Sequence, residues 1–156
     1  MKNLIIYYSL SGNTKKAADI IQSVTNGTLA QIRTIKPYTG NYKDIMVSAQ
    51  NEVRNKIMPP IYVPEINLDD YETIFLGTPV WWYSISPALN TFLHAYPLSD
   101  KSVFPFITGD GWWGHTMQII NNLCPGAHEG IEIQFDGSEL ITNQYEIIKW
   151  AKNAIQ

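Results

Sequence analysis

The chain has 156 residues, of which 45% are hydrophobic and 16% are charged, and its formal net charge is -3. This composition is typical of one folded domain, here residues 1–156, and argues against a disordered chain. The longest apolar runs are far shorter than the ~20 residues of a membrane span, and the acidic balance provides no surface for nucleic acid. The N-terminal apolar run is too short for a signal peptide, and the single cysteine cannot form an internal disulfide. We therefore expect a soluble, cytoplasmic protein with no membrane or nucleic-acid partner.

Four elements are predicted in the first part of the chain. Residues 4–8 form a continuous apolar run that ends at turn residues, as in a strand buried on both faces. Residues 14–25 carry apolar side chains at helical spacing and are followed by an Asn-Gly pair, which is a typical helix stop. A second strand is expected at 28–35 and a mostly polar helix at 44–56.

The next predicted unit is a third strand at 72–77 followed by a helix that begins at Ser86. Ser86 supplies a capping hydroxyl, and Pro87 follows at the first helical position, where its missing N–H group is not needed. The apolar face of this helix is expected to consist of Ala88, Leu89, Phe92 and Leu93.

Two further strands and two further helices complete the predicted order. A strand at 103–108 precedes a helix at 117–123, and a fifth strand is expected at 130–135. The last helix begins near Asn143, with Glu146 as its capping-box partner. Its buried face is expected to contain Tyr145, Ile148, Ala151 and Ile155.

The alternation of strands and helices favours an α/β fold. We expect one doubly wound, five-stranded parallel sheet with helices on both faces, since right-handed crossovers distribute the helices in that way. Ligands bind to such sheets beyond the carboxyl ends of the strands. The segments after the first, third and fourth strands are therefore the expected binding loops.

Residues 9–14, Ser-Leu-Ser-Gly-Asn-Thr, connect the first strand to the first helix. Backbone N–H groups and the helix dipole favour an anion at this position, hydroxyl groups add donors, and glycine allows a tight turn. The pattern therefore suits a phosphate, but it equally fits an ordinary capped helix start. The Gly-x-x-x-x-Gly-Lys-Ser/Thr spacing of nucleotide triphosphate sites is absent.

At this loop the sequence resembles the flavodoxins, whose phosphate loop has the same hydroxyl-x-hydroxyl-Gly-x-Thr form. Residues 77–83, Gly-Thr-Pro-Val-Trp-Trp-Tyr, look like the second flavin loop of that family, and residues 108–115, Thr-Gly-Asp-Gly-Trp-Trp-Gly-His, look like the third. The chain is most similar to short bacterial flavodoxin-like proteins, and the similarity extends along its whole length. The resemblance implies strand order 2-1-3-4-5 and flavin mononucleotide (FMN) bound with its ring between the second and third loops.

The resemblance also implies which residues contact FMN. The flat flavin ring requires aromatic faces and backbone donors more than charges, and no catalytic acid, base or nucleophile is expected. The second and third loops contain five aromatic residues, Trp81, Trp82, Tyr83, Trp112 and Trp113. We expect at least two of them to pack within the protein rather than against the flavin. The expected contacts are Ser9, Ser11, Gly12, Asn13 and Thr14 in the first loop, Thr78, Pro79, Val80, Trp81, Trp82 and Tyr83 in the second, and Gly109, Asp110, Gly111, Trp112, Gly114 and His115 in the third.

Some other signals compete with a flavin site. Residues 109–114 match the Gly-x-Gly-x-x-Gly pattern of nicotinamide dinucleotide sites, with Glu132 downstream. That pattern normally opens the first strand-helix unit, and two tryptophans crowd this turn, so the flavin loop is the favoured interpretation. His115 is more simply explained as an exposed or capping residue and Cys124 as a packed, inert thiol. The three histidines are too widely spaced to indicate a metal site.

We therefore expect an FMN-binding redox protein, monomeric or homodimeric. It would be either an electron carrier with a redox partner protein or a reductase that transfers electrons from NAD(P)H to small quinone-like acceptors. The alternatives are a non-catalytic binding module of the same fold and a nicotinamide dinucleotide-binding protein. In flavodoxins a peptide in the second loop flips when the flavin is reduced, and glycine keeps this flip inexpensive. Residues 80–83 contain no glycine, so the resemblance implies that the flipped state is disfavoured here, which suits a two-electron reductase better than a one-electron carrier.

Overall fold

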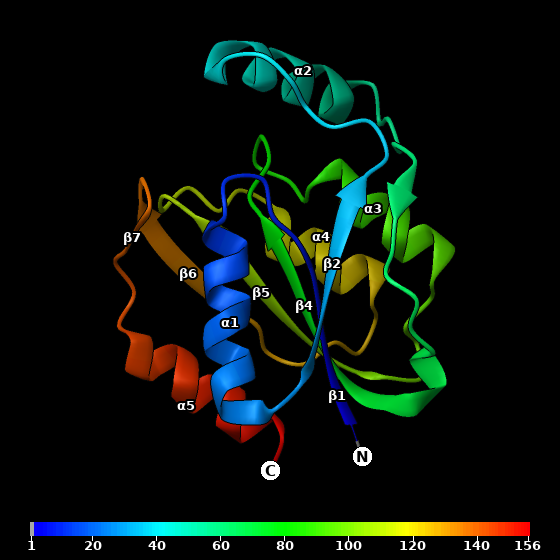
Figure 1. The fold of residues 1–156 in the computed structure, drawn as a ribbon, viewed down its shortest axis with the longest axis vertical. Coiled ribbons are helices and arrows are strands. Elements are labelled where there is room, and N and C mark those ends of the chain that lie inside the picture. Colours follow the sequence, from blue (N-terminus) through cyan, green and yellow to red (C-terminus); the bar gives the residue numbers. More distant parts are fainter. Residues whose placement is uncertain (1) are drawn as a thin grey trace.

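The computed structural model describes residues 2–156, which form a central sheet with helices on both faces (Figure 1). The strands are β1 (Lys2–Tyr8), β2 (Thr28–Thr34), β3 (Ile61–Tyr62), β4 (Tyr71–Pro79), β5 (Ser102–Gly109), β6 (Ile131–Asp136) and β7 (Glu139–Leu140). The helices are α1 (Asn13–Thr25), α2 (Tyr42–Arg54), α3 (Pro87–Ala95), α4 (Thr116–Leu123) and α5 (Gln144–Ala154), with a short 3-10 helix at Leu68–Asp70. Within residues 2–156, no helix has the length and apolar character that crossing a membrane requires.

The sheet has seven strands in the order β3-β2-β1-β4-β5-β6-β7. The five long strands are parallel and follow the expected order 2-1-3-4-5. The prediction of a purely parallel, five-stranded sheet is wrong at the edges, because β3 and β7 add one antiparallel strand to each side. Each of these strands has two residues, which is too short for an alternating hydrophobic pattern to reveal.

Two hydrophobic cores lie on opposite faces of the sheet, because successive side chains of a strand point to opposite faces. In β1, Leu4 and Ile6 contribute to the core beneath α3 and α4, while Ile5 and Tyr7 contribute to the core beneath α1 and α5. Figure 1 shows α2 apart from these layers, beyond the carboxyl ends of the parallel strands. This helix is therefore placed over the edge at which ligands are expected.

The predicted cap residues Ser86 and Asn143 begin α3 and α5, but Glu146 does not form the expected capping box with Asn143, and the buried face of α5 differs from the prediction. Ser86 accepts a hydrogen bond from the N–H of Leu89 at the start of α3, and Asn143 accepts one from Tyr145 at the start of α5. The expected α5 face is wrong in part: Ala151 is buried as expected, but Tyr145 is 66% exposed, Ile155 is also exposed and Ile147 is fully buried. Adjacent isoleucines at 147 and 148 permit either orientation, and the edge-on contact of Trp150 with Phe75 accompanies the one adopted.

Gly77 lies in the carboxyl half of β4, paired with Tyr7 of β1 on one side and with Phe106 of β5 on the other. A Cβ atom at Gly77 would lie 2.3 Å from Cζ of Phe106, so the phenyl ring occupies the space of a side chain. The absence of a side chain at Gly77 therefore allows the Phe106 ring to lie over β4 on one face of the sheet.

We predict that Gly77→Ala lowers the free energy of unfolding by about 1–3 kcal/mol, because it overpacks this contact. In a Phe106→Leu background the same change should cost less, since the shorter side chain gives way. Urea denaturation of the four proteins measures both values. An equal cost of Gly77→Ala in both backgrounds would show that the Phe106 ring is not the obstacle.

Candidate functional site

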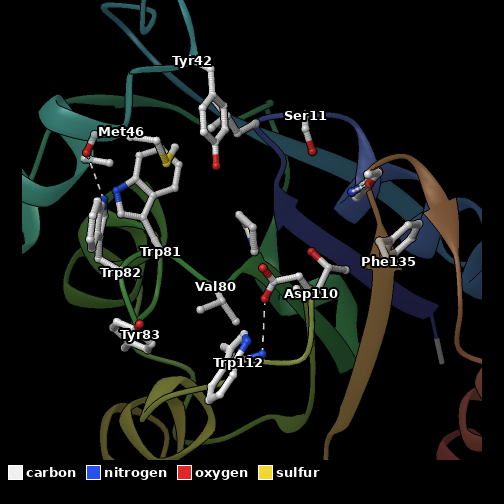
Figure 2. Close-up of a pocket in the computed structure, with 17 residues that line it drawn as sticks. Ser11, Tyr42, Met46, Val80, Trp81, Trp82, Tyr83, Asp110, Trp112 and Phe135 are labelled. Atoms are coloured by element: carbon white, nitrogen blue, oxygen red, sulfur yellow. Dashed lines mark hydrogen bonds between the residues drawn. The ribbon is translucent and has the colours of Figure 1, made fainter. Parts of the chain in front are cut away.

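A cavity of about 500 Å³ opens at the carboxyl ends of the parallel strands (Figure 2). This volume lies within the ~300–1,000 Å³ usual for sites that bind small molecules and cofactors. The loops after β1, β4 and β5 meet there with α2 and with the end of β6. The lining residues are Leu10, Ser11, Asn13, Tyr42, Met46, Ala49, Pro79, Val80, Trp81, Trp82, Tyr83, Thr108, Gly109, Asp110, Trp112, Phe135 and Gly137.

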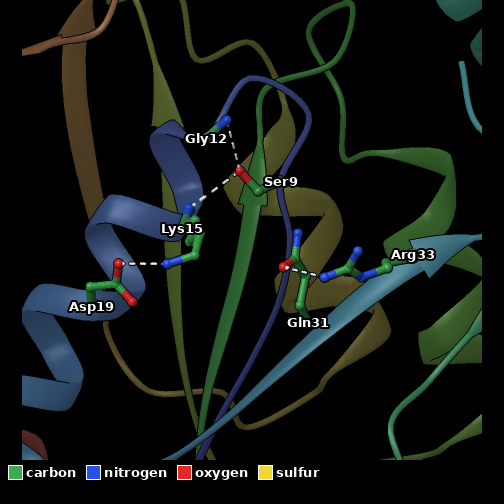
Figure 3. A network of polar contacts seen from close by, with 6 residues as sticks. All are labelled: Ser9, Gly12, Lys15, Asp19, Gln31 and Arg33. Carbon is green, nitrogen blue, oxygen red and sulfur yellow. Dashed lines mark hydrogen bonds and ion pairs between the residues drawn. The ribbon is translucent and has the colours of Figure 1, made fainter. Parts of the chain in front are cut away.

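The loop after β1 is folded around the side chain of Ser9. Its hydroxyl oxygen accepts hydrogen bonds from the N–H groups of Gly12 at 3.2 Å and Lys15 at 3.3 Å (Figure 3). Gly12 has a φ of 99°, a left-handed conformation that favours glycine. The N–H groups of Asn13 and Thr14 make no hydrogen bond within residues 2–156, so they are free for a ligand. Free N–H groups at a helix N-terminus suit an anion.

Two side-chain hydrogen bonds join this loop to other parts of the site. The hydroxyls of Thr14 and Thr108 are 2.8 Å apart and buried, which joins the start of α1 to the end of β5. Asn13 Nδ2 donates to the carbonyl of Gly137, between β6 and β7, at 2.8 Å. The Thr14 hydroxyl, which we expected to contact phosphate, is thus committed to Thr108. The loop is held in place by neutral groups rather than by basic side chains.

The loop after β4 forms a tight turn at residues 81–84. Trp81 and Ser84 exchange two backbone hydrogen bonds of 2.9 and 3.1 Å, and the central residues Trp82 and Tyr83 have φ values of 48° and 61°. Bulky residues therefore adopt positive φ at this turn, although this conformation is costly for them. The N–H of His115 donates to the Tyr83 carbonyl at 2.9 Å, and this contact helps to hold the strained turn. These φ values weaken the steric argument for a two-electron reductase, and the electron count stays a prediction.

The aromatic residues of these loops divide into packed and exposed groups. Trp81 is 4% exposed, and its ring contacts those of Tyr8 and Tyr38 with centroid distances of 5.9 and 5.1 Å. Trp113 is partly buried against the core and does not line the cavity. By contrast, Trp112 is 74% exposed at the cavity, where a flat ligand could cover it.

The loop after β5 provides one wall and the only charged side chain among the lining residues, Asp110. A carboxylate oxygen of Asp110 accepts a hydrogen bond from the N–H of Trp112 at 3.3 Å. The backbone carbonyl of Asp110 accepts a second one from Gln134 Nε2 at 3.2 Å. His115 is exposed and does not line the cavity. A Cβ at Gly114 would lie 2.5 Å from Tyr83 Cα, so this glycine permits the close contact of the second and third loops.

Sequence reasoning missed the contribution of α2. Tyr42, Met46 and Ala49 project from one face of this helix into the cavity, and Trp82 Nε1 donates to the Met46 carbonyl at 3.0 Å (Figure 2). Their helical spacing was visible in the sequence, but it did not reveal what the face covers. Leu10, Thr108, Phe135 and Gly137 were missed as well, although Leu10 and Thr108 lie within predicted loops.

The structure brings most of the expected site residues together. Those that line the cavity are Ser11, Asn13, Pro79, Val80, Trp81, Trp82, Tyr83, Gly109, Asp110 and Trp112. The others shape the loops without lining the cavity: they are Ser9, Gly12, Thr14, Thr78, Gly111, Gly114 and His115. Thr78, for example, is fully buried and bonds to Ser86 at the start of α3.

The family model described as "Flavodoxin" matches residues 2–153 of the chain. The chain belongs to this flavodoxin family. A flavodoxin-family assignment agrees with the strand order and with the position of the cavity. It also agrees with the resemblance of the three loops.

Several known proteins are similar to this flavodoxin. A putative flavoprotein from Bacteroides eggerthii has a TM-score of 0.83 at 26% identity, covering 99% of this chain and 98% of that one. The flavoprotein of Lactobacillus acidophilus, solved in complex with FMN, has a TM-score of 0.73 at 25% identity, covering 84% and 91%. A sequence relative named "Uncharacterized NAD(P)H oxidoreductase YcaK", from Escherichia coli, is 23% identical, covering 85% of this chain and 84% of that protein.

We predict that Trp82→Phe loosens α2, because it removes the hydrogen bond to Met46. Loss of one such bond, worth about 0.5–1.5 kcal/mol, should speed amide hydrogen exchange in α2 roughly 2- to 10-fold. Trp150→Phe is the matched control, since Trp150 Nε1 makes an equivalent 3.0 Å bond to the Glu129 carbonyl elsewhere. Exchange in α2 that is equally fast in both variants would contradict a specific role of Trp82.

Proposed function

We propose that this chain binds FMN non-covalently in the cavity and acts as a redox flavoprotein. The observation that carries the proposal is the meeting of two features at one edge of the sheet. A loop with free N–H groups at Asn13 and Thr14 suits a phosphate, and it lies beside an aromatic cavity that suits a flat ring. The FMN complex of the Lactobacillus acidophilus flavoprotein supports the choice of cofactor.

The residues present fit FMN in both polarity and shape. Ser11 and Asn13 line the part of the cavity next to the free N–H groups and would hold the phosphate. Trp81, Trp82, Tyr83 and Trp112 provide the aromatic surfaces for the ring. The chain places no basic side chain among the lining residues, so phosphate binding would depend on backbone and neutral donors.

Bound FMN would supply the electron-transfer chemistry. The protein's own residues would orient the ring and exclude water from one side of it, because Trp81 is buried and α2 covers the cavity with Tyr42 and Met46. The electron donor in this proposal is NAD(P)H and the acceptor is a small quinone-like molecule, with a redox partner protein as the other route. The name of the Escherichia coli relative, an NAD(P)H oxidoreductase, supports the first route.

We predict that Gly12→Ala weakens FMN binding about 10-fold or more, because alanine at a φ of 99° displaces the loop and its phosphate donors. Gly126→Ala is the matched control: Gly126 has a φ of 88°, equally open surroundings and no place in the cavity. Riboflavin, which lacks the phosphate, should bind wild type and Gly12→Ala with similar affinity. Fluorescence titration measures all of these constants, and FMN affinity that is equal in the two variants would remove the loop from the site.

We also predict that the FMN-loaded protein is reduced by NADH or NADPH under anaerobic conditions and reoxidised by a benzoquinone. Loss and return of flavin absorbance would report the two half-reactions. The protein without FMN is the control and should oxidise neither nucleotide. If neither nucleotide reduces the flavin while dithionite does, the chain is better described as an electron carrier that requires a redox partner protein.

A further inference from the structure

Two buried polar atoms beside the cavity have no hydrogen-bond partner within residues 2–156. They are Oε1 of Glu52, on α2, and Nε1 of Trp81, on the turn after β4. The first is a hydrogen-bond acceptor when the carboxyl group is ionised, and the second is a donor. Buried polar groups in folded proteins almost always have partners, so the two atoms require an explanation.

The two atoms belong to one cluster organised around Tyr38. The Tyr38 hydroxyl donates to the other carboxylate oxygen of Glu52, Oε2, at 3.0 Å. The ring of Tyr38 also contacts that of Trp81, with centroids 5.1 Å apart and planes tilted by 49°. Glu52 and Trp81 therefore both contact Tyr38, one through its hydroxyl and the other through its ring.

Tyr8, at the end of β1, completes this cluster. Its ring meets Trp81 edge-on, with centroids 5.9 Å apart. Burial, followed by the charge of Glu52, raises the pKa of the Tyr8 hydroxyl. Burial also raises the pKa of Glu52, although its hydrogen bond from Tyr38 acts in the opposite direction.

We propose that Glu52 is a positioning residue for Trp81 and acts through one buried water molecule. The water accepts a hydrogen bond from Trp81 Nε1 and donates one to Glu52 Oε1, and the Tyr8 hydroxyl is its third partner. Buried waters typically make about three such bonds to groups that are otherwise unpaired. A water is both donor and acceptor, so it matches the unpaired donor and the unpaired acceptor together.

This inference rests on the proposed function in one respect: Trp81 lines the cavity assigned to FMN. Fixing its indole fixes the shape of that wall. The bridge also joins α2 to the turn after β4 at a second point, in addition to the Trp82–Met46 hydrogen bond. Glu52 thereby holds the helix that carries Tyr42 and Met46 over the cavity.

The test is a double-mutant cycle between Glu52→Met and Trp81→Phe. Methionine is similar in length to glutamate but is only a weak hydrogen-bond acceptor, whereas the control Glu52→Gln retains an oxygen acceptor. Glu52→Met also removes the hydrogen bond from Tyr38, but this loss occurs in both backgrounds and cancels in the cycle. We expect each of the first two changes to weaken FMN binding about fivefold, and the double mutant to bind no more weakly than Trp81→Phe alone. Glu52→Gln should remain within about twofold of wild type.

The unfolding equilibrium of the FMN-free protein provides a second cycle that does not depend on the cofactor. We expect the losses in the free energy of unfolding caused by Glu52→Met and Trp81→Phe to be non-additive as well. Near-UV circular dichroism would report the environment of the Trp81 ring. If wild type does not bind FMN, the proposed function fails while this second cycle still decides the inference. If Glu52→Met does not fold, Tyr8→Phe replaces it, because this change removes the third partner of the water.

A high-resolution crystal structure should show a water within about 3.2 Å of both Glu52 Oε1 and Trp81 Nε1. Additive effects in the FMN-free cycle would overturn the inference. A crystal structure with no water between the two atoms would also overturn it.

Discussion

The ring of Phe106 occupies the space that a side chain at residue 77 would need. The contact is possible because Gly77 of β4 pairs directly with Phe106 of β5. Gly77 also pairs with Tyr7 of β1, so the three strands are aligned across one row. Because the strands are parallel, their carboxyl ends reach the same edge of the sheet together. The loops that follow them meet there and enclose the cavity.

Different forces hold the different walls of this cavity. The loop after β1 is held by hydrogen bonds from backbone N–H groups to the Ser9 hydroxyl and by the buried hydroxyl pair of Thr14 and Thr108. The N–H groups of Asn13 and Thr14 remain free within residues 2–156. The turn after β4 is held in a strained conformation by its neighbour, through the His115 N–H. Helix α2 is attached mainly through side chains, including Trp82 and Glu52. The loop after β1 and the turn after β4 are therefore fixed by segments directly connected to the sheet, whereas the position of α2 depends on individual side-chain contacts.

The sequence was informative where a physical pattern is local. All five parallel strands were predicted, β1 from a continuous apolar run, and hydroxyl and glycine residues at 9–14 identified a loop suited to an anion. Two-residue strands carry no such pattern, which is why β3 and β7 were missed. The orientation of α5 was ambiguous because Ile147 and Ile148 are adjacent, and the contacts of Trp150 with Phe75 and Phe104, which come from distant strands, accompany the orientation adopted.

The site was harder to predict where distant segments determine its shape. The positive φ of Trp82 and Tyr83 opposes their intrinsic preference and is stabilised by residues of the next loop. Tyr42 and Met46 show helical spacing, but spacing does not state which surface a helix covers. The hydrogen bond from Trp82 to the Met46 carbonyl joins segments that are far apart in the chain, and nothing in either segment indicates it.

The most direct test of the account is a nuclear magnetic resonance titration of the isotope-labelled protein with FMN. The account predicts that the amide signals of Ser11, Asn13 and Thr14 shift strongly, together with the indole N–H signal of Trp81, and that the shifts saturate at one FMN per chain. Riboflavin should shift the indole signal but leave the loop amides nearly unchanged, because it has no phosphate. Saturable FMN binding without shifts in the loop amides, or no binding at all, would contradict the account.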